Sequence, residues 1–396
     1  MLFRPTLFLL LTSFISLTIP CSAGDLFSPD KDFTQPSTPE ISGDENSNQQ
    51  EAASFQVNPA LTVVYGTHGA KGDTRSSMED THYPLNAHVS RLRELSPLIA
   101  DGIHFFGLYD GHGGKNAAQY AQARLHNILQ ETECFRKGDY KNALSEAYLK
   151  THEEYIAGAQ NNDGTTAVTA LFVGSELLIA NAGDSEAVLY LENQKAQCIT
   201  QIHSPADKNE CMRIMSHHGS AVKIIRKEKI VTYQHVLKDN GKPSIYKVST
   251  ETPTKYRNAL TYNFLDTYSL GGDETYIEKF HTVGKIIRKD TFYLAVSRGL
   301  GDKKYLPFVT PTPFVQSLKL DQPGFLILGC DGLWDVMSYQ AAVNFVLRDM
   351  NLKNLTLQRL THDDAEQIAE HLVSKALEIC DHDNVTVSLI FFTPNL

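Results

Sequence analysis

The chain has 396 residues, of which 42% are hydrophobic and 21% charged, a composition typical of a globular protein with enough apolar area for a large core. Its formal net charge of −10 argues against nonspecific binding to nucleic acid or to an anionic membrane as the main activity.

The N-terminus has the pattern of a secretory signal peptide. The residues MLFRP carry one positive charge, and an apolar run extends from Thr6 to Ile19. The small residues Cys21 and Ala23 suit cleavage after Ala23, and the apolar run is short for a membrane span. We therefore expect a signal peptide at 1–23 and a secreted or lumenal protein, with an uncleaved membrane anchor as the alternative.

The rest of the chain divides into a polar segment and one domain. Residues 24–56 are rich in Ser, Pro, Asp, Glu, Asn and Gln, which predicts a disordered linker. Residues 57–396 show neither a second linker nor a repeat. The cysteines beyond the signal are scattered and odd in number, which indicates buried free thiols rather than a disulfide framework. Asn354 and Asn384 lie in glycosylation acceptor motifs, whose use requires a eukaryotic secretory route.

Strand-like runs and helical patterns interleave along the domain. We predict strands at 61–67, 103–109, 165–173, 176–182, 186–192, 291–297, 325–330 and 385–392. Helices are predicted at 115–131, 142–156, 339–350 and 364–379, the third with Ser338 as its N-cap. Tight turns separate the third, fourth and fifth strands, which predicts an antiparallel meander. These elements imply an α+β domain in which two sheets face each other with helices outside.

Carboxylates recur where apolar strands begin or end. Six acids lie at such strand ends or in the adjoining turns: Glu79, Asp80, Asp110, Asp184, Asp331 and Asp383. Any one of them alone is adequately explained as a turn or capping residue. Gathered together, they would repel one another unless a cation neutralised them. Oxygen ligands without a His or Cys cluster favour Mg²⁺ or Mn²⁺ over zinc or copper.

The neighbours of these acids suit phosphoryl chemistry. Two bridged hard metals generate a hydroxide at neutral pH and clamp an in-line phosphoryl displacement. Gly111 and Gly113 would let the backbone approach closely, so that a main-chain carbonyl could join the ligands. Arg75 would present a planar fork to phosphate oxygens, and His112 could protonate the departing alkoxide. The alternatives are a surface charge for Arg75 and a structural histidine for His112.

At this point the motifs resemble those of a known family. GDTRSSMED, LYDGHGG, DGTTAV, ANAGDS, AVSRGLGD, LGCDGLWDV and DNVTV occur in the order seen in metal-dependent serine/threonine protein phosphatases of type 2C. The resemblance covers about Leu61 to Phe392, apart from one segment. It implies a four-layer α-β-β-α sandwich, two mainly antiparallel sheets flanked by helices, with a binuclear Mn²⁺/Mg²⁺ centre at one end.

The resemblance also implies roles for matching residues. The implied metal ligands are Asp110, which would bridge both metals, the carbonyl of Gly111, Asp331, Asp383, Glu79 and Asp80. Arg75 matches the phosphate-binding arginine and His112 the general acid. Asp184 and Asp335 match positions associated with a weaker third metal.

Three departures from the family's pattern stand out. Glu186 occupies the place where arginine usually follows GDS, and adds negative charge near the possible third metal. Gly299 replaces the alanine common in the SRALGD block, which we interpret as a packing change. An insertion at about 223–290 replaces a much shorter connection. Its basic first half predicts contact with acidic or phosphorylated partners, unless it is only a solvated face on a tolerated insertion.

These observations predict metal-dependent hydrolysis of phosphoserine and phosphothreonine in proteins. We expect a monomer that acts on phosphorylated proteins, with no nucleic-acid partner and no stable membrane insertion after signal cleavage. Family resemblance does not by itself establish the substrate. Two alternatives therefore stay open: a catalytically weak pseudophosphatase acting as a binding or regulatory module, and a phosphatase of small phosphoesters.

Overall fold

The computed structural model describes residues 61–84, 98–100, 102–159, 161–205, 207–216, 221–226, 229–237, 243–251, 283–288 and 292–395. All of them belong to the compact unit Gln56–Leu396. The predicted signal peptide and polar linker lie outside the described residues.

One central sheet has five strands in the order β1-β19-β18-β9-β10. Its strands are β1 (Leu61–Ala70), β9 (Glu186–Leu191), β10 (Gln197–Cys198), β18 (Gly324–Gly329) and β19 (Val385–Pro394). The first and last strands of the domain pair antiparallel, from Leu61 with Pro394 to Ala70 with Val385. This pairing brings the segment after β1 next to the segment before β19, where predicted site residues lie.

The second central sheet has the order β17-β8-β7-β4-β2, and β3 pairs with β4 outside this path. Its strands are β2 (Thr81–Tyr83), β3 (Leu98–Ala100), β4 (Ile103–Tyr109), β7 (Ala167–Val173), β8 (Glu176–Ala182) and β17 (Phe314–Lys319). β4 and β7 are buried along nearly their whole length. Burial on both sides explains why these strands read as continuous apolar runs rather than as alternating ones.

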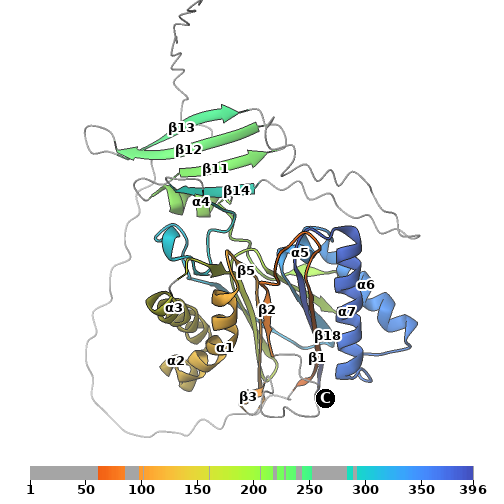
Figure 1. The fold of residues 1–396 in the computed structure, drawn as a ribbon. Coiled ribbons are helices and arrows are strands. Elements are labelled where there is room, and N and C mark those ends of the chain that lie inside the picture. The colour runs from red at the N-terminus through yellow and green to blue at the C-terminus, as the bar shows by residue number, and fades with distance from the viewer. Residues whose placement is uncertain are drawn as a thin grey trace, which may run out of the picture. The chain divides into compact units, whose positions relative to one another are not determined.

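The two sheets face each other and helices cover their outer sides (Figure 1). Phe106, Phe172 and Phe392 belong to the apolar cluster between the sheets. The helices α1 (Asn116–Glu131) and α3 (Tyr140–Gly158) pack on the β4 sheet, while α6 (Tyr339–Leu352) and α7 (His362–Ile379) pack on the β18 sheet. The predicted four-layer α+β sandwich is confirmed.

The long helices begin and end close to their predicted positions. The predicted N-cap of α6 is confirmed, since the Ser338 hydroxyl accepts a hydrogen bond from the N–H of Ala341 at 3.2 Å. Thr361 and Asp364 form a capping box at the start of α7. The sequence patterns missed three short helices, α2 (Glu133–Arg136), α4 (Lys208–Met215) and α5 (Asp331–Trp334). Helices this short have too few turns to show an apolar period.

The predicted meander is wrong at its third strand. β7 and β8 pair antiparallel, as expected, but β9 pairs with β18 and β10 in the other sheet. The turn after β8 therefore crosses between the sheets, beginning at Gly183 with φ of 117°. A strand buried on both sides has the same apolar sequence pattern whether the next strand pairs with it or lies in the opposite sheet. The crossing places Asp184 at the end of the sandwich.

Two smaller sheets complete the described fold. One has the order β16-β6-β5 and consists of β5 (Gly111–His112), β6 (Gly164–Thr165) and β16 (Leu300–Gly301). The other has the order β13-β12-β11-β14-β15 and consists of β11 (Ala221–Arg226), β12 (Lys229–Leu237), β13 (Pro243–Glu251), β14 (Val283–Arg288) and β15 (Phe292–Leu294). β15 is shorter than the strand predicted at 291–297.

Two further features complete the description. The five cysteines beyond the signal are free, as predicted, although Cys330 alone of them is fully buried. None of the helices in the described part of the chain has the length and apolar character that a bilayer span requires.

Candidate active site

Asp110 lies directly after β4, and its backbone is fixed there by three hydrogen bonds. Its carbonyl oxygen accepts from the N–H of Thr166 at 2.9 Å and from the hydroxyl of Thr165 at 3.0 Å. Its own N–H donates to the Thr166 hydroxyl at 3.3 Å. The carboxylate is therefore held at the end of a buried strand.

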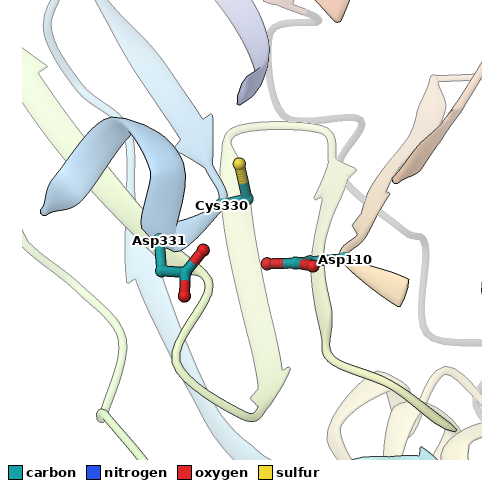
Figure 2. A group of neighbouring side chains, drawn as sticks. All are labelled: Asp110, Cys330 and Asp331. Carbon is teal, nitrogen blue, oxygen red and sulfur yellow. The ribbon is translucent and has the colours of Figure 1, made fainter. Parts of the chain in front are cut away.

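Asp331 approaches Asp110 from the other sheet. It is the first residue of α5 and follows β18 and Cys330. A carboxylate oxygen of each aspartate and the sulfur of Cys330 all lie within 4.8 Å of one another. Figure 2 shows the two carboxylates facing each other, with the Cys330 sulfur directed to one side of them. The thiol also accepts from the N–H of Thr386 at 3.2 Å, which ties it to β19.

The β1–β19 pairing delivers two further acids. Asp80 is only 6% exposed, and one of its carboxylate oxygens accepts from the Thr386 hydroxyl at 2.8 Å. Asp383 immediately precedes β19, and its carboxylate pairs with the guanidinium of Arg75 at 2.5 Å. Arg75 also donates to the carbonyl of His382 at 3.2 Å. The predicted phosphate-binding arginine thus lies at the cluster, with nearly half of its side chain exposed.

Asp184 and Asp335, the residues matched to a weaker third metal, lie close enough to this group to raise the pKa of Asp331. The N–H of Asp335 donates to the carbonyl of Asp331 at 2.7 Å, across one turn of chain. Burial raises the pKa of Asp184 to about 6, and Asp335 is the neighbour that contributes most to this rise. Glu186 adds to it as well. The carboxylate of Glu186 is itself buried and accepts from the Tyr339 hydroxyl at 2.5 Å.

The electrostatics of the cluster are those of a cation site. Burial, and then the mutual repulsion of the acids, holds the pKa values of Asp110 and Asp331 well above the usual range for aspartate. Burial also raises the pKa of Asp80 to about 6. For Asp383, burial outweighs the opposing effect of Arg75, so that the net pKa shift is upward. A divalent cation would relieve the repulsion that remains among these carboxylates.

The glycine-rich loop after Asp110 packs tightly against Glu79. A Cβ on Gly111 would lie 2.5 Å from the carbonyl oxygen of Glu79, so only glycine fits there. The carboxylate of Glu79 accepts from the hydroxyl of Ser77 at 3.1 Å and from the N–H of Gly114 at 3.4 Å. Gly113 has φ of 69°, in the left-handed region that favours glycine. The close backbone approach predicted for this loop is confirmed at Gly111.

Asp163 supports this loop from a distant part of the chain. Its carboxylate accepts from the N–H of Asn116, at the start of α1, at 3.0 Å, and from the Tyr155 hydroxyl at 2.5 Å. It therefore caps α1, whose own N-cap residue makes no side-chain hydrogen bond.

His112 has a partner that the sequence did not identify. Its Nε2 lies 2.9 and 3.0 Å from the two carboxylate oxygens of Asp302, a residue that is only 1% exposed. Burial alone would lower the pKa of His112, but the charge and hydrogen bonds of Asp302 outweigh burial and raise it. Asp302 lies 190 positions away, so no spacing in the sequence could have shown the contact.

A buried ionic network joins α4 to the loop that carries Asp302. Glu210 on α4 is 1% exposed and lies 2.6 Å from Arg298 and 2.9 Å from Arg213. The Ser297 hydroxyl donates to the same carboxylate at 2.7 Å. Burial raises the pKa of Glu210, but the two guanidinium groups and the hydroxyl outweigh it and lower the pKa to about 2. Glu210 therefore differs from the aspartate cluster, because two guanidinium groups of the same chain balance its charge.

Gly299 fits this packed loop. A Cβ there would lie 2.9 Å from the carbonyl oxygen of Thr165 and 3.3 Å from a carboxylate oxygen of Asp302. The packing change predicted from the sequence therefore lies where the backbone of residue 299 packs against Thr165 and the carboxylate of Asp302.

Comparison with known proteins identifies the family. The family model described as Protein phosphatase 2C matches residues 66–237 and 269–385. The chain belongs to this family. Members of the protein phosphatase 2C family generally use Mn²⁺ or Mg²⁺, and the cluster of carboxylate oxygens around Asp110 fits such ions.

The relatives are distant and mostly longer. The chain is 29% identical over 334 residues to "Protein spalten" of Dictyostelium discoideum, covering 83% of this chain but 28% of that protein. It is 28% identical over 376 residues to the human "Integrin-linked kinase-associated serine/threonine phosphatase 2C", covering 88% and 78% of the two chains. Several other relatives are covered over 62% to 66% of their length.

The fold is shared with solved structures. The chain aligns with the crystal structure of serine-threonine phosphatase 2C from Toxoplasma gondii with a TM-score of 0.56 at 19% identity. The alignment covers 85% of this chain and 100% of that one.

Proposed function

We propose that this chain hydrolyses phosphoserine and phosphothreonine in proteins in a metal-dependent reaction. The observation that carries the proposal is the convergence of Asp80, Asp110, Asp331 and Asp383 from both sheets with raised pKa values. Such a cluster does not stabilise the fold on its own, because neighbouring carboxylates repel one another.

The proposed ligands are the residues that the sequence motifs single out. Asp110 and the carbonyl of Gly111, with Asp331 and Asp383, would hold two Mn²⁺ or Mg²⁺ ions, and Glu79 and Asp80 would act directly or through water. Asp184 and Asp335 would hold a weaker third ion, beside Glu186. When bound, such ions neutralise phosphate charge and lower the pKa of water, so that a nucleophile is available at neutral pH.

The remaining chemistry belongs to side chains of this chain. Arg75 is the proposed contact for the phosphate oxygens, because its planar guanidinium lies at the exposed edge of the cluster. His112 is the proposed general acid, which gives a proton to the serine or threonine oxygen as the phosphorus–oxygen bond breaks. Although burial lowers the pKa of His112, the carboxylate of Asp302 raises it overall, which favours the protonated imidazole.

The decisive test compares wild type with Asp110→Ala on a phosphothreonine peptide in Mn²⁺, Mg²⁺ or EDTA. We expect turnover that requires metal and is lost in the variant, while Asp321→Asn, in the exposed turn after β17, retains it. A panel of sugar and nucleotide phosphates separates a protein phosphatase from a phosphatase of small phosphoesters. Metal binding without turnover of any substrate would instead identify a pseudophosphatase.

We also propose that the protein enters a secretory pathway, on the basis of the N-terminal pattern at 1–23. N-terminal sequencing of protein recovered from the medium or lumen tests this, and a mature N-terminus at Gly24 is expected. An intact Met1 on a membrane-bound product would favour the uncleaved anchor.

The insertion at about 223–290 is proposed to contact acidic or phosphorylated partner surfaces, because its first half is locally basic in an acidic protein. Its deletion should raise KM for phosphoproteins while turnover of p-nitrophenyl phosphate stays unchanged. If the deletion variant and wild type had equal KM values for every protein substrate, this role would be contradicted.

A further inference from the structure

The small sheet β16-β6-β5 sets His112 beside Asp302. His112 on β5 is the cross-strand partner of Gly164 on β6, and Gly164 is the partner of Gly301 on β16. Gly301 immediately precedes Asp302. A Cβ on Gly164 would collide with the carboxyl group of Asp302. The glycine between the two strands therefore leaves the space through which the imidazole and the carboxylate meet.

The backbone of Asp302 is held on both sides. Its N–H donates to the carbonyl of Asp163 at 3.1 Å, and its carbonyl accepts from the N–H of Tyr305 at 2.7 Å. Its φ is 50° and its ψ 35°, a left-handed conformation that is uncommon for residues other than glycine. Such conformations persist where the surrounding structure fixes them, and they gather at functional sites.

We propose that Asp302 is the positioning residue of His112. By binding Nε2 of the imidazole, Asp302 fixes the plane of the ring and leaves Nδ1 as the nitrogen that meets the leaving oxygen. The inference rests on the proposed phosphoester hydrolysis. As the phosphorus–oxygen bond breaks, the proton on Nδ1 passes to the ester oxygen, its electron pair stays on Nδ1, and Nε2 keeps its proton toward Asp302. Orientation of a histidine by a buried carboxylate serves the same purpose in other acid–base sites.

A purely structural role is the competing explanation, because a buried carboxylate needs hydrogen-bond partners wherever it lies. The two explanations differ in their dependence on the leaving group. An alkoxide such as that of threonine needs a proton to depart, whereas p-nitrophenolate is a weak base and departs without one. Loss of a positioned acid therefore slows the first substrate far more than the second, while a general weakening of the fold slows both alike.

The experiment measures kcat for a phosphothreonine peptide and for p-nitrophenyl phosphate in wild type, Asp302→Asn, Asp302→Glu and His112→Asn. General acids contribute about 10²–10⁴-fold, so Asp302→Asn should lose about 100-fold or more on the peptide and less than about 10-fold on the nitrophenyl ester. His112→Asn should show the same pattern, and the double variant should be no slower than the slower single variant. Asp302→Glu should recover part of the loss.

Asp349→Asn is the matched control. Asp349 on α6 pairs with His371 on α7 at 3.0 Å, so the same substitution breaks a His–Asp pair on the outer helices. It should leave both rates unchanged. Equal losses of both substrates in Asp302→Asn, or rates that fall additively with His112→Asn, would overturn the proposal.

A second readout needs no turnover. Nitrogen-15 NMR of histidine-labelled protein in EDTA reports which nitrogen of His112 carries a proton, with His112→Asn identifying its signals. Wild type should show a protonated, hydrogen-bonded Nε2 that changes in Asp302→Asn while the other histidine signals stay in place. Unchanged His112 signals would contradict the positioning role. If wild type turned over neither substrate, the proposed function would fail, and the NMR comparison would still decide whether Asp302 orients the ring.

Discussion

Replacement of Asp80 by asparagine should stabilise the metal-free protein. Burial raises the pKa of Asp80 from 3.8 to about 6, so the folded state holds its ionised form at a cost at neutral pH. A rise of roughly two pKa units corresponds to about 3 kcal/mol of unfolding free energy. Asparagine has nearly the same shape, and its amide oxygen can still accept from the Thr386 hydroxyl, which now lies 2.8 Å from the carboxylate.

The pH dependence of this effect has a definite sign. The folded state binds the proton more tightly than the unfolded chain does, so this group's contribution to stability falls as pH rises from about 4 to 6. The gain in Asp80→Asn over wild type should therefore be complete above pH 7 and vanish near pH 4. Urea unfolding in EDTA across this range measures the difference between the two proteins, to which the lost repulsion between Asp80 and Asp110 adds in the same direction.

In saturating Mn²⁺, wild type should become more stable than Asp80→Asn. A ligand that binds only the folded state stabilises the protein that binds it more tightly, and we expect that protein to be wild type. Asp321→Asn, at an exposed position, should leave the free energy of unfolding within about 0.5 kcal/mol of wild type. A destabilised Asp80→Asn protein in EDTA at pH 7, or a difference that does not change with pH, would refute the reasoning.

Three further predictions concern the surroundings of the site. Glu210→Gln should lose about 3 kcal/mol of unfolding free energy at pH 7, because the paired carboxylate has a pKa near 2, and the loss should shrink as pH falls below 4.5 in urea titrations. Gly164→Ala should lower stability by about 1–3 kcal/mol in the same assay and should slow phosphothreonine hydrolysis, because its methyl group displaces Asp302; wild-type rates would contradict this. After export from a eukaryotic cell, endoglycosidase should shift the mass of wild type but not of Asn354→Gln. Asn354 is exposed, whereas Asn384 is 4% exposed and donates to the Ser77 carbonyl at 3.2 Å, so a glycan on Asn384 in the folded protein would contradict the structure.

The layers of the fold could be predicted because each depends on a local period. The apolar spacing of α7 and the hydroxyl of Ser338 are visible within a few residues, and both have the expected role in the structure. The position of Asp110 at the end of a buried strand is local in the same sense. What a local pattern does not contain is the partner of a strand. The buried strands β8 and β9 therefore looked like neighbours although they belong to different sheets.

The same limit explains which site residues were missed. Asp302 contacts His112 across 190 positions, and Glu210 contacts Arg298 across 88. Asp302 and Arg298 lie in the AVSRGLGD motif and Glu210 lies on a short helix, but none of these local patterns indicates the distant partner. Motif order identified the acids of the cluster, but it assigned no role to the residues that hold their neighbours in place.

Two kinds of acid in this chain, one with basic partners and one with acidic neighbours, show which assignments rest on physical grounds as well as on resemblance. Glu210 has two guanidinium groups within hydrogen-bonding distance, and its pKa lies far below the usual value. Asp110 and Asp331 are only partly buried, yet burial and the repulsion of other acids hold their pKa values well above the usual value. Repulsion among these aspartates destabilises the metal-free folded state, whereas the two guanidinium groups stabilise the carboxylate of Glu210. Arg75 supplies only part of that charge, and it does so at Asp383, on the open edge of the cluster. The direction of these pKa shifts therefore distinguishes Glu210, which its neighbours stabilise as a carboxylate, from the aspartates that we propose as cation ligands.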